Sequence, residues 1–430
     1  MRLLQVALAV SAGILATTVS PRAQTAEPRY AGAPVHYDRP APDNSVAALA
    51  AGIADGSIEL ERDPDHGLLP ALLAALDVPA SSQTLVFSKT SFQNDRIGPR
   101  SPRAIYFGDR AYVGYVPGSR ILEATAVDPE RGSVFYSITD DGDGSPVIRR
   151  DDAACLNCHA FAWNRGWPGH LVRSVFPSAS GQPLQRLGSD VVDHDSPWDV
   201  RWGGWFVTGA PPAMQHRGNA VWPDDANDPS PAAAETLDPE HGFDPSRYPE
   251  ATSDVVALMV LEHQTQVHNR IAWANYEATA ALARQHEANA ALDRPADHLG
   301  DATRDRLHEL ADELLGALLF RDEPPLPAPI PEGSRFAADF AARGPRDDAG
   351  RSLREFDLET RLFRWPLSYV IQGDAFRRLH PAIRDVVLLR LERILSGRFG
   401  RRTYRHLSPD DRATILEIVR VTVPDLPEDF

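Results

Sequence analysis

The chain has 430 residues, a formal net charge of −16, 43% hydrophobic residues and 24% charged residues. This hydrophobic content is typical of a globular protein, and the negative charge argues against nucleic acid and against anionic lipid surfaces as partners. The length exceeds what one hydrophobic core usually serves, so we expect two or three domains.

Residues 1–26 have the pattern of a secretory signal peptide. Met1-Arg2 is a short basic start, Leu3 to Val19 is apolar, and Ser20 to Ala26 is small and polar. No later stretch approaches the roughly 20 apolar residues that span a bilayer. We therefore expect a periplasmic or secreted protein with no membrane span after leader cleavage; an uncleaved N-terminal anchor is the alternative.

Residues 27–140 are predicted to form a domain of helices and antiparallel sheet. Ser45 to Ala54 and Leu68 to Leu76 have helical apolar spacing, with Asn44 or Ser45 as the first cap. From Thr84 the period changes to two, which predicts an antiparallel sheet of four or five strands with hairpin turns at 108–109 and 128–132. The expected strands are Leu85–Phe87, Ala104–Phe107, Ala111–Val116, Ile121–Val127 and Ser133–Ile138.

Residues 141–222 contain the motif Cys155-x-x-Cys158-His159, and these are the two cysteines of the chain. This spacing attaches haem covalently, because each thiol can add to one vinyl group of a single porphyrin. The adjacent histidine then supplies the proximal ligand to iron. A disulfide and a thioredoxin-like redox pair are the alternatives. A redox pair should follow a buried strand, whereas residues 149–154 are not a hydrophobic strand.

The distal iron ligand is open to several candidates. His170 is the first choice, because its eleven-residue separation from His159 is ample to round a haem edge and Pro168-Gly169 supplies a turn. Met214, His216 and an open sixth position are the alternatives, and His194 also lies nearby. Four arginines are candidates for pairing with haem propionates, and six tryptophans for lining the pocket. They are Arg165, Arg173, Arg201 and Arg217, and Trp163, Trp167, Trp198, Trp202, Trp205 and Trp222.

Residues 223–250 are predicted to be a linker and residues 251–430 a helical domain. Ser253 is expected to cap a helix that runs to about Asn289. The other expected helices are Asp301–Phe320, Leu353–Phe363, Ala382–Leu395 and Pro409–Val421. The fold class is therefore α+β, with an N-terminal antiparallel sheet, a loop-rich haem segment and an all-helical C-terminal half.

Three further residues are candidate functional groups. His263 and His268 lie five apart on the long helix, about 140° around its axis, so they do not face one metal together. Lys89 is the one lysine among 44 basic residues. An amine can lose its proton or bind a metal where a guanidinium cannot, although a GC-rich genome also explains its rarity.

The motif Cys155 to His159 resembles that of the c-type cytochromes. The wider pattern of Gly166 to Phe176, Arg201 to Trp205 and Glu262 to Thr265 is similar to a group of large exported single-haem proteins of unassigned role. The resemblance implies one haem c per chain, iron coordination and electron transfer, carried by Cys155, Cys158 and His159. The chain departs from the small cytochrome c fold because its motif lies mid-chain, after a sheet.

Three functions follow as hypotheses. The first is an electron-transfer cytochrome with a redox partner protein. The second is a haem enzyme of peroxidase or oxygenase type with an open iron site, in which Lys89, Arg173, His263 or His268 could serve as distal polar groups. The third is a periplasmic binding or scaffold protein that carries a haem and docks a partner through its helical half.

Overall fold

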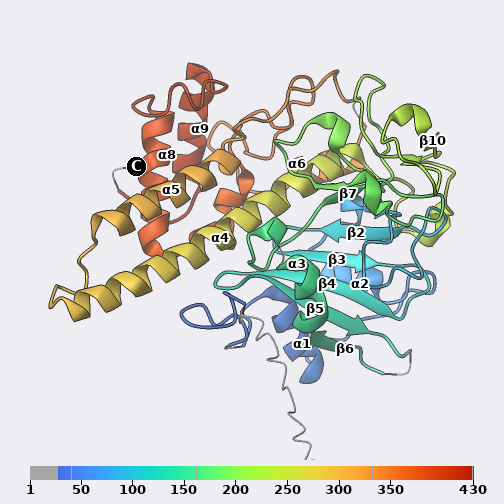
Figure 1. Cartoon of the computed structure of the whole chain (residues 1–430), viewed down its shortest axis with the longest axis horizontal. Helices are drawn as coiled ribbons and strands as arrows, with labels where there is room; N and C mark the ends of the chain where they lie inside the picture. The colour runs from blue at the N-terminus through green and yellow to red at the C-terminus, as the bar shows by residue number, and fades with distance from the viewer. Residues whose placement is uncertain (1–27, 40, 143, 161, 332, 429) are drawn as a thin grey trace, which may run out of the picture.

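The computed structural model describes residues 28–430 except 40, 143, 161, 332 and 429. The expected signal peptide, residues 1–26, lies outside the described residues. The α+β class is confirmed: a six-stranded antiparallel meander precedes helices that lie mostly in the C-terminal half (Figure 1). The strands, which neighbour one another in chain order, are β1 (Thr84–Val86), β2 (Arg103–Phe107), β3 (Ala111–Tyr115), β4 (Ile121–Asp128), β5 (Gly132–Thr139) and β6 (Val147–Arg150).

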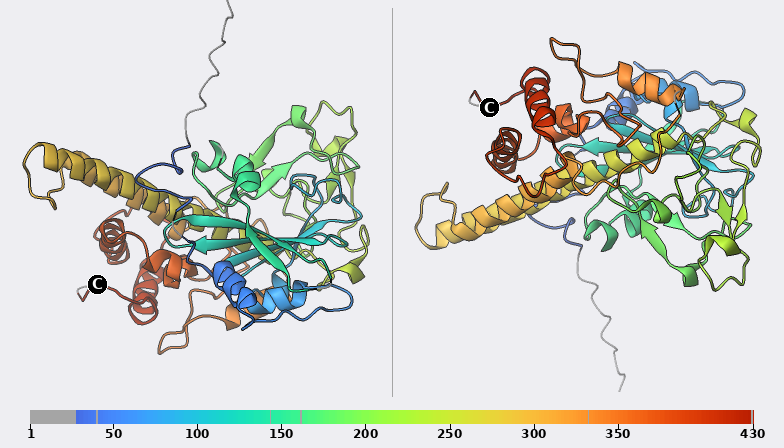
Figure 2. Two further views of the ribbon diagram at one scale, coloured as in Figure 1. Left: turned by 90° about the horizontal axis from the view of Figure 1, so that it is seen from below. Right: turned by 90° about the horizontal axis from the view of Figure 1, so that it is seen from above.

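Alternation along the strands gives the sheet two differently covered faces. On β5, Val134, Tyr136 and Ile138 pack into a core with α1 (Ser45–Ala54) and α2 (Leu69–Ala75). Helix α3 (Asp152–His159) lies on the opposite side of the sheet (Figure 2). The two N-terminal helices are confirmed, and the Asn44 side chain accepts the N–H of Ala47 as the cap of α1.

Strand β6 was not expected from the sequence. Its residues alternate between exposed and half-buried positions, as in an edge strand, so it lacks the apolar run that marks a buried strand. Helix α3 begins two residues after it. The expectation that residues 149–154 are not a hydrophobic strand is confirmed, because β6 has no buried residue and is not the buried strand that a thioredoxin-like site uses.

The longest helix is α4 (Val255–Ala291). Its N-terminal half runs beside the sheet, and its C-terminal end projects beyond the rest of the molecule (Figure 1). Its predicted cap was wrong. Asp254 accepts the N–H groups of Val256 and Ala257, whereas the Ser253 hydroxyl accepts the N–H of Leu85, 2.9 Å away, and so ties the start of α4 to β1.

Helix α5 (Asp301–Leu318) packs back along α4, and α8 (Pro381–Leu395) and α9 (Pro409–Thr422) confirm two further predictions. The predicted helix Leu353–Phe363 is wrong. Asp357 accepts the backbone N–H groups of Glu359 and Thr360, a turn that competes with helical hydrogen bonding. Two short helices that the sequence did not indicate flank this segment, α6 (Arg335–Ala342) and α7 (Asp374–Arg377).

Residues 160–250 are mostly irregular, with two small two-stranded sheets. These pair β7 (Arg173–Val175) with β8 (Ser189–Val191), and β9 (Ala220–Val221) with β10 (Glu235–Thr236). Phe243 and Tyr248, from the expected linker, are buried in the core that contains α1 and α2. The division into domains stays a prediction. None of the described helices is long and apolar enough to cross a membrane.

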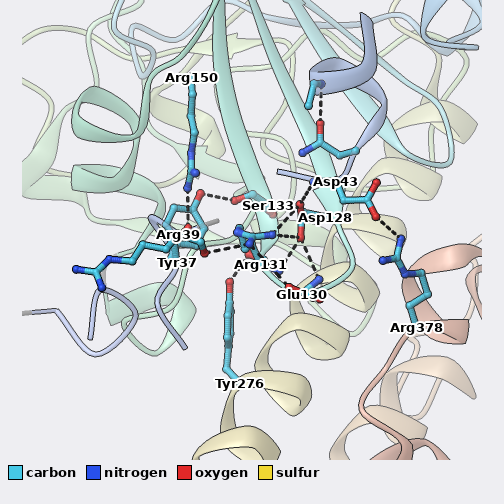
Figure 3. A network of polar contacts seen from close by, with 12 residues as sticks. Tyr37, Arg39, Asp43, Asp128, Glu130, Arg131, Ser133, Arg150, Tyr276 and Arg378 are labelled. Atoms are coloured by element: carbon cyan, nitrogen blue, oxygen red, sulfur yellow. Dashed lines mark hydrogen bonds and ion pairs between the residues drawn. The ribbon is translucent and has the colours of Figure 1, made fainter. Parts of the chain in front are cut away.

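A buried polar network fastens the N-terminal segment to the turn between β4 and β5 (Figure 3). Asp128 and Arg131 form an ion pair at 3.1 Å, with side chains 0% and 4% exposed. Asp128 also accepts the N–H of Asp43, and Arg131 donates to the carbonyl of Arg39. Tyr276 of α4 donates to the carbonyl of Arg131, so three distant parts of the chain meet at this turn.

Candidate functional site

Helix α3 presents the motif residues. Cys155 and Cys158 lie three apart, so they share one face of the helix; Cys155 is half-buried and Cys158 is exposed. Cys155 is the fourth residue of the helix, where its N–H donates to the carbonyl of Asp151 and closes the first turn, and Cys158 lies in the last turn.

A cavity of about 410 Å³, here called the sheet cavity, adjoins the motif. This volume falls within the roughly 300–1,000 Å³ that small-molecule sites usually have. Its walls come from the sheet, from α3, from the segment 163–173 and from α4. They include Cys155, Cys158 and His159 together with the apolar side chains of Ile105, Phe135, Leu171, Val172, Trp205 and Leu261. A flat apolar ligand held by the motif therefore has a chamber beside it.

The His159 side chain is oriented for coordination. Its Nδ1 lies 2.9 Å from the carbonyl oxygen of Gly169, and its ring packs on Phe135 at 4.6 Å between centroids. Burial lowers the pKa of His159, so the imidazole is neutral near pH 7. Because Nδ1–H donates to Gly169, the lone pair lies on Nε2, which is the arrangement that metal-binding histidines use.

Gly169 is itself held from three sides. Its N–H donates to the carbonyl of His159, 3.0 Å away. A Cβ at this position would lie 2.6 Å from Asn269 Oδ1 and 2.8 Å from Asn164 Nδ2. A larger residue at this position would therefore displace the Asn164 and Asn269 side chains, which themselves bond the backbone of residues 159 and 170.

His170, the predicted distal ligand, also borders the sheet cavity. Its Nδ1 lies 2.9 Å from Ser133 Oγ and its ring lies 4.1 Å from that of Tyr112. Its Nε2 is shielded from solvent and has no hydrogen-bond partner among the described residues. Ser133 and Phe135 are two residues apart on one face of β5, about 7 Å along the strand, so the two imidazoles lie on the same side of the cavity.

Charged side chains at the cavity differ from those predicted. Arg173 lines it, as does Arg103, which the sequence did not single out and which pairs with Glu123. The other three predicted arginines pair with acids outside the cavity lining. These pairs are Arg165 with Glu313, Arg201 with Glu262, and Arg217 with Asp190.

Several other predicted residues lie away from the sheet cavity. Met214 is buried in the core, and the His216 ring packs on Trp202. His194 Nδ1 lies 3.0 Å from His263 Nδ1. Of the six tryptophans, Trp163 and Trp205 border the cavity, and Lys89 is outside the lining.

The sequence analysis did not predict that buried polar residues of α4 form one hydrogen-bonded network. Gln264 Nε2 donates to the Tyr112 hydroxyl at 2.9 Å, and this hydroxyl lies 2.8 Å from His268 Nδ1. Tyr369 donates to the Gln264 Oε1. All four side chains are buried. The signal was the polar stretch from Glu262 to His268 inside an apolar helix, since a helix buried all round must pair such groups internally.

The described residues contain no group of three or more His, Cys, Asp or Glu side chains that could hold a metal ion. Haem iron needs only one or two protein ligands, because the porphyrin supplies the other four nitrogens. The motif, the apolar chamber and the neutral His159 therefore fit haem. Comparisons with protein-family models, with curated proteins and with solved structures gave no match.

Proposed function

We propose that this protein is an exported c-type cytochrome that carries one haem and acts in electron transfer. Cys155 and Cys158 would hold the porphyrin through thioether bonds, and His159 would bind the iron through Nε2. The observation that carries the proposal is the hydrogen bond between His159 Nδ1 and Gly169 at the wall of an apolar cavity. Bound haem would supply a one-electron redox centre.

The rest of the site supports this assignment. Arg173 provides positive charge at the cavity, where propionates would otherwise add to a net charge of −16, whereas the charge of Arg103 is compensated by Glu123 in the same lining. Phe92 and Trp163 border the same cavity and are each 51% exposed, so they mark the edge through which a redox partner protein would exchange electrons. The chain's net charge favours a cationic or neutral partner.

Covalent attachment is tested by producing the full chain with haem-maturation enzymes and extracting it with acid acetone. We expect the red colour to stay with the protein. The double variant Cys155→Ala and Cys158→Ala should lose its colour to the solvent, while His159→Ala should keep the colour but with an altered spectrum. Extraction of haem from the wild type would overturn the proposal.

A second candidate function, a haem enzyme with an open iron site, is favoured by the position of His170. Its neighbour Gly169 is hydrogen-bonded to His159, and its Nε2 is shielded from solvent. Coordination of one iron by both imidazoles would therefore require residues 169–170 to move. Carbon monoxide separates the two candidates: an unchanged ferrous spectrum indicates a closed carrier, whereas a shifted Soret band indicates an open site.

A further inference from the structure

A second cavity, of about 520 Å³, lies at the hairpin turns of the sheet and is separate from the sheet cavity. It is bordered by α1, by the turns at 109–110 and 127–129, and by α7. Two ion pairs stand at its border: Arg354 with Asp109, and Arg378 with Asp43 at 2.8 Å, the latter shown in Figure 3. Two further aspartates of the lining, Asp77 and Asp374, pair with Arg343 and Arg377, and Arg110 also lines the cavity. Because each of the four aspartates is paired with an arginine, the cavity favours an uncharged ligand with polar groups over a strongly charged one.

The two cavities are connected by side chains. His268 and Tyr369 line the second cavity, and Tyr112 lines the sheet cavity. The Tyr112 hydroxyl accepts from Gln264 Nε2 at 2.9 Å, so its own proton is directed to His268 Nδ1 at 2.8 Å. With Nδ1 as the acceptor, the neutral His268 carries its proton on Nε2. One imidazole and one phenol thus separate the second cavity from the space beside His159.

This connection is costly to build. Tyr112, Gln264 and His268 are 6%, 1% and 4% exposed, and burying such polar groups is unfavourable unless every one is hydrogen-bonded. Burial also lowers the pKa of His268 to about 4, which keeps the imidazole neutral. Each of the three groups is hydrogen-bonded, so the network is stable in this buried position and joins the linings of the two cavities.

We propose that the second cavity binds a small dihydroxyaromatic reductant of the hydroquinone class, and that its electrons tunnel to the sheet cavity through the hydrogen-bonded side chains of His268 and Tyr112, neither of which is itself oxidised. The inference rests on the proposed function, which supplies ferric haem as the one-electron acceptor. A hydroquinone is uncharged, offers hydroxyl groups to polar residues, and releases a proton with each electron. The mixed apolar and ion-paired lining suits such a molecule, with Leu76, Val127 and Val370 against the ring and Asp109 at the hydroxyl.

The reaction balances as follows. One hydroxyl of the reductant would lose an electron, which would reduce the ferric iron of the bound haem to ferrous, and a proton, which would pass to solvent water. Two molecules oxidised by one electron then disproportionate to one quinone and one hydroquinone. Asp109 borders the cavity and is 48% exposed, so its carboxylate can accept a hydrogen bond from the hydroxyl that loses the proton.

The test measures anaerobic reduction of the ferric full-length protein by benzene-1,4-diol in a stopped-flow instrument. We expect the rate to saturate with reductant concentration. Tyr112→Phe should lower the saturated rate at least tenfold while changing the half-saturating concentration less than twofold. Ala48→Trp, at an exposed position of the cavity wall on α1, should raise the half-saturating concentration at least tenfold.

Tyr106→Phe is the matched control, because Tyr106 is a buried tyrosine of the neighbouring strand β2 that bonds to the amide of Gln83 on the other face of the sheet. It should behave as the wild type. Calorimetric titration of the dithionite-reduced protein with benzene-1,4-diol should show one site, which Ala48→Trp removes and Tyr112→Phe retains. Reduction by dithionite should be equal in all variants.

Each failure is distinguishable. A protein with no haem for dithionite to reduce would contradict the proposed function itself. A protein that dithionite reduces, but whose rate rises linearly with benzene-1,4-diol, would overturn the inference alone. Equal rates in Tyr112→Phe and Tyr106→Phe would overturn it as well.

Discussion

Gly169 determines how the His159 imidazole is held. The carbonyl of Gly169 accepts from Nδ1, and the side chains of Asn164 and Asn269 occupy the space that any Cβ would need. The strength and direction of this hydrogen bond affect how strongly Nε2 donates to a metal. The backbone of Gly169 therefore influences how strongly the His159 imidazole would bind a metal.

We expect Gly169→Ala to destabilise the protein by about 1–3 kcal/mol, because the added methyl group forces packed neighbours to shift. Chemical denaturation measures this change. Gly144→Ala is the control, since a Cβ at Gly144 meets nothing within 4 Å, and it should change stability by less than about 0.5 kcal/mol. Equal destabilisation by the two variants would contradict the packing described for Gly169.

His268 makes stability depend on pH. Its folded-state pKa is lowered to about 4 by burial, whereas in the unfolded chain it titrates near its ordinary value of about 6.5. Between these values the unfolded state binds the extra proton, so the contribution of His268 is complete above about pH 6.5 and is lost as the pH falls.

The matched variant is His268→Gln, which has no titrating group. We expect the difference in unfolding free energy, wild type minus variant, to be constant above about pH 6.5. It should then decrease by about 1.4 kcal/mol per pH unit down to about pH 4. Urea denaturation at several pH values measures it, and a difference that does not vary with pH would show that His268 is not buried as a neutral group.

At the scale of elements, the hairpin of β4 and β5 is the junction of the N-terminal segment, the sheet and α4. Its turn contains the buried pair of Asp128 and Arg131, and Tyr276 of α4 donates to the Arg131 carbonyl. One face of β5 serves the core with α1 and α2, and the other contacts His159 through Phe135 and His170 through Ser133. Disturbing this hairpin should therefore affect both fold and site.

We expect Asp128→Ala to destabilise the protein by about 3–5 kcal/mol, because it leaves the Arg131 charge buried without its partner. Asp301→Ala removes an ion pair with Arg304 in which Asp301 is 91% exposed, and it should cost less than about 1 kcal/mol. Denaturation of both variants in urea gives the comparison. A similar loss in the two would mean that the hairpin pair is open to water.

At the scale of the whole molecule, the sheet cavity joins parts of the chain that are far apart. Leu261 and Thr265 of α4, Tyr112 of β3 and Trp205 all border it. A covalently held haem would fill this space and hold these elements together. The proposed cofactor is therefore expected to stabilise the whole chain as well as to provide chemistry.

We expect the melting temperature of Cys155→Ala with Cys158→Ala to lie more than about 5 °C below that of the haem-loaded wild type. Calorimetry measures the two transitions. The wild-type chain produced without haem should have the same melting temperature as the double variant. This control separates the effect of losing the cofactor from any effect of the substitutions. Equal melting temperatures of the haem-loaded and haem-free proteins would contradict the idea that haem fills the sheet cavity.

Much of the fold could be predicted from local patterns. The period of two predicted five of the six strands of the meander but none of the short strands β7 to β10, and helical spacing predicted α1, α2, α4, α5, α8 and α9. Strand β6 was not predicted because it is an edge strand without a buried apolar face. The helix predicted over Leu353–Phe363 was wrong because the Asp357 side chain accepts hydrogen bonds from its own turn, which outweighs the helical apolar spacing.

The sequence by itself predicted the chemistry proposed for the motif, since two thiols and an imidazole in five residues need no distant partner to indicate haem attachment. The tertiary structure alone decided that Gly169 accepts from His159, that Arg103 faces the cavity, and that Tyr112 meets His268 across 156 residues. Periodicity specifies which face of an element is buried. Periodicity does not specify which other element this face contacts, because that depends on how the whole sheet packs against α4.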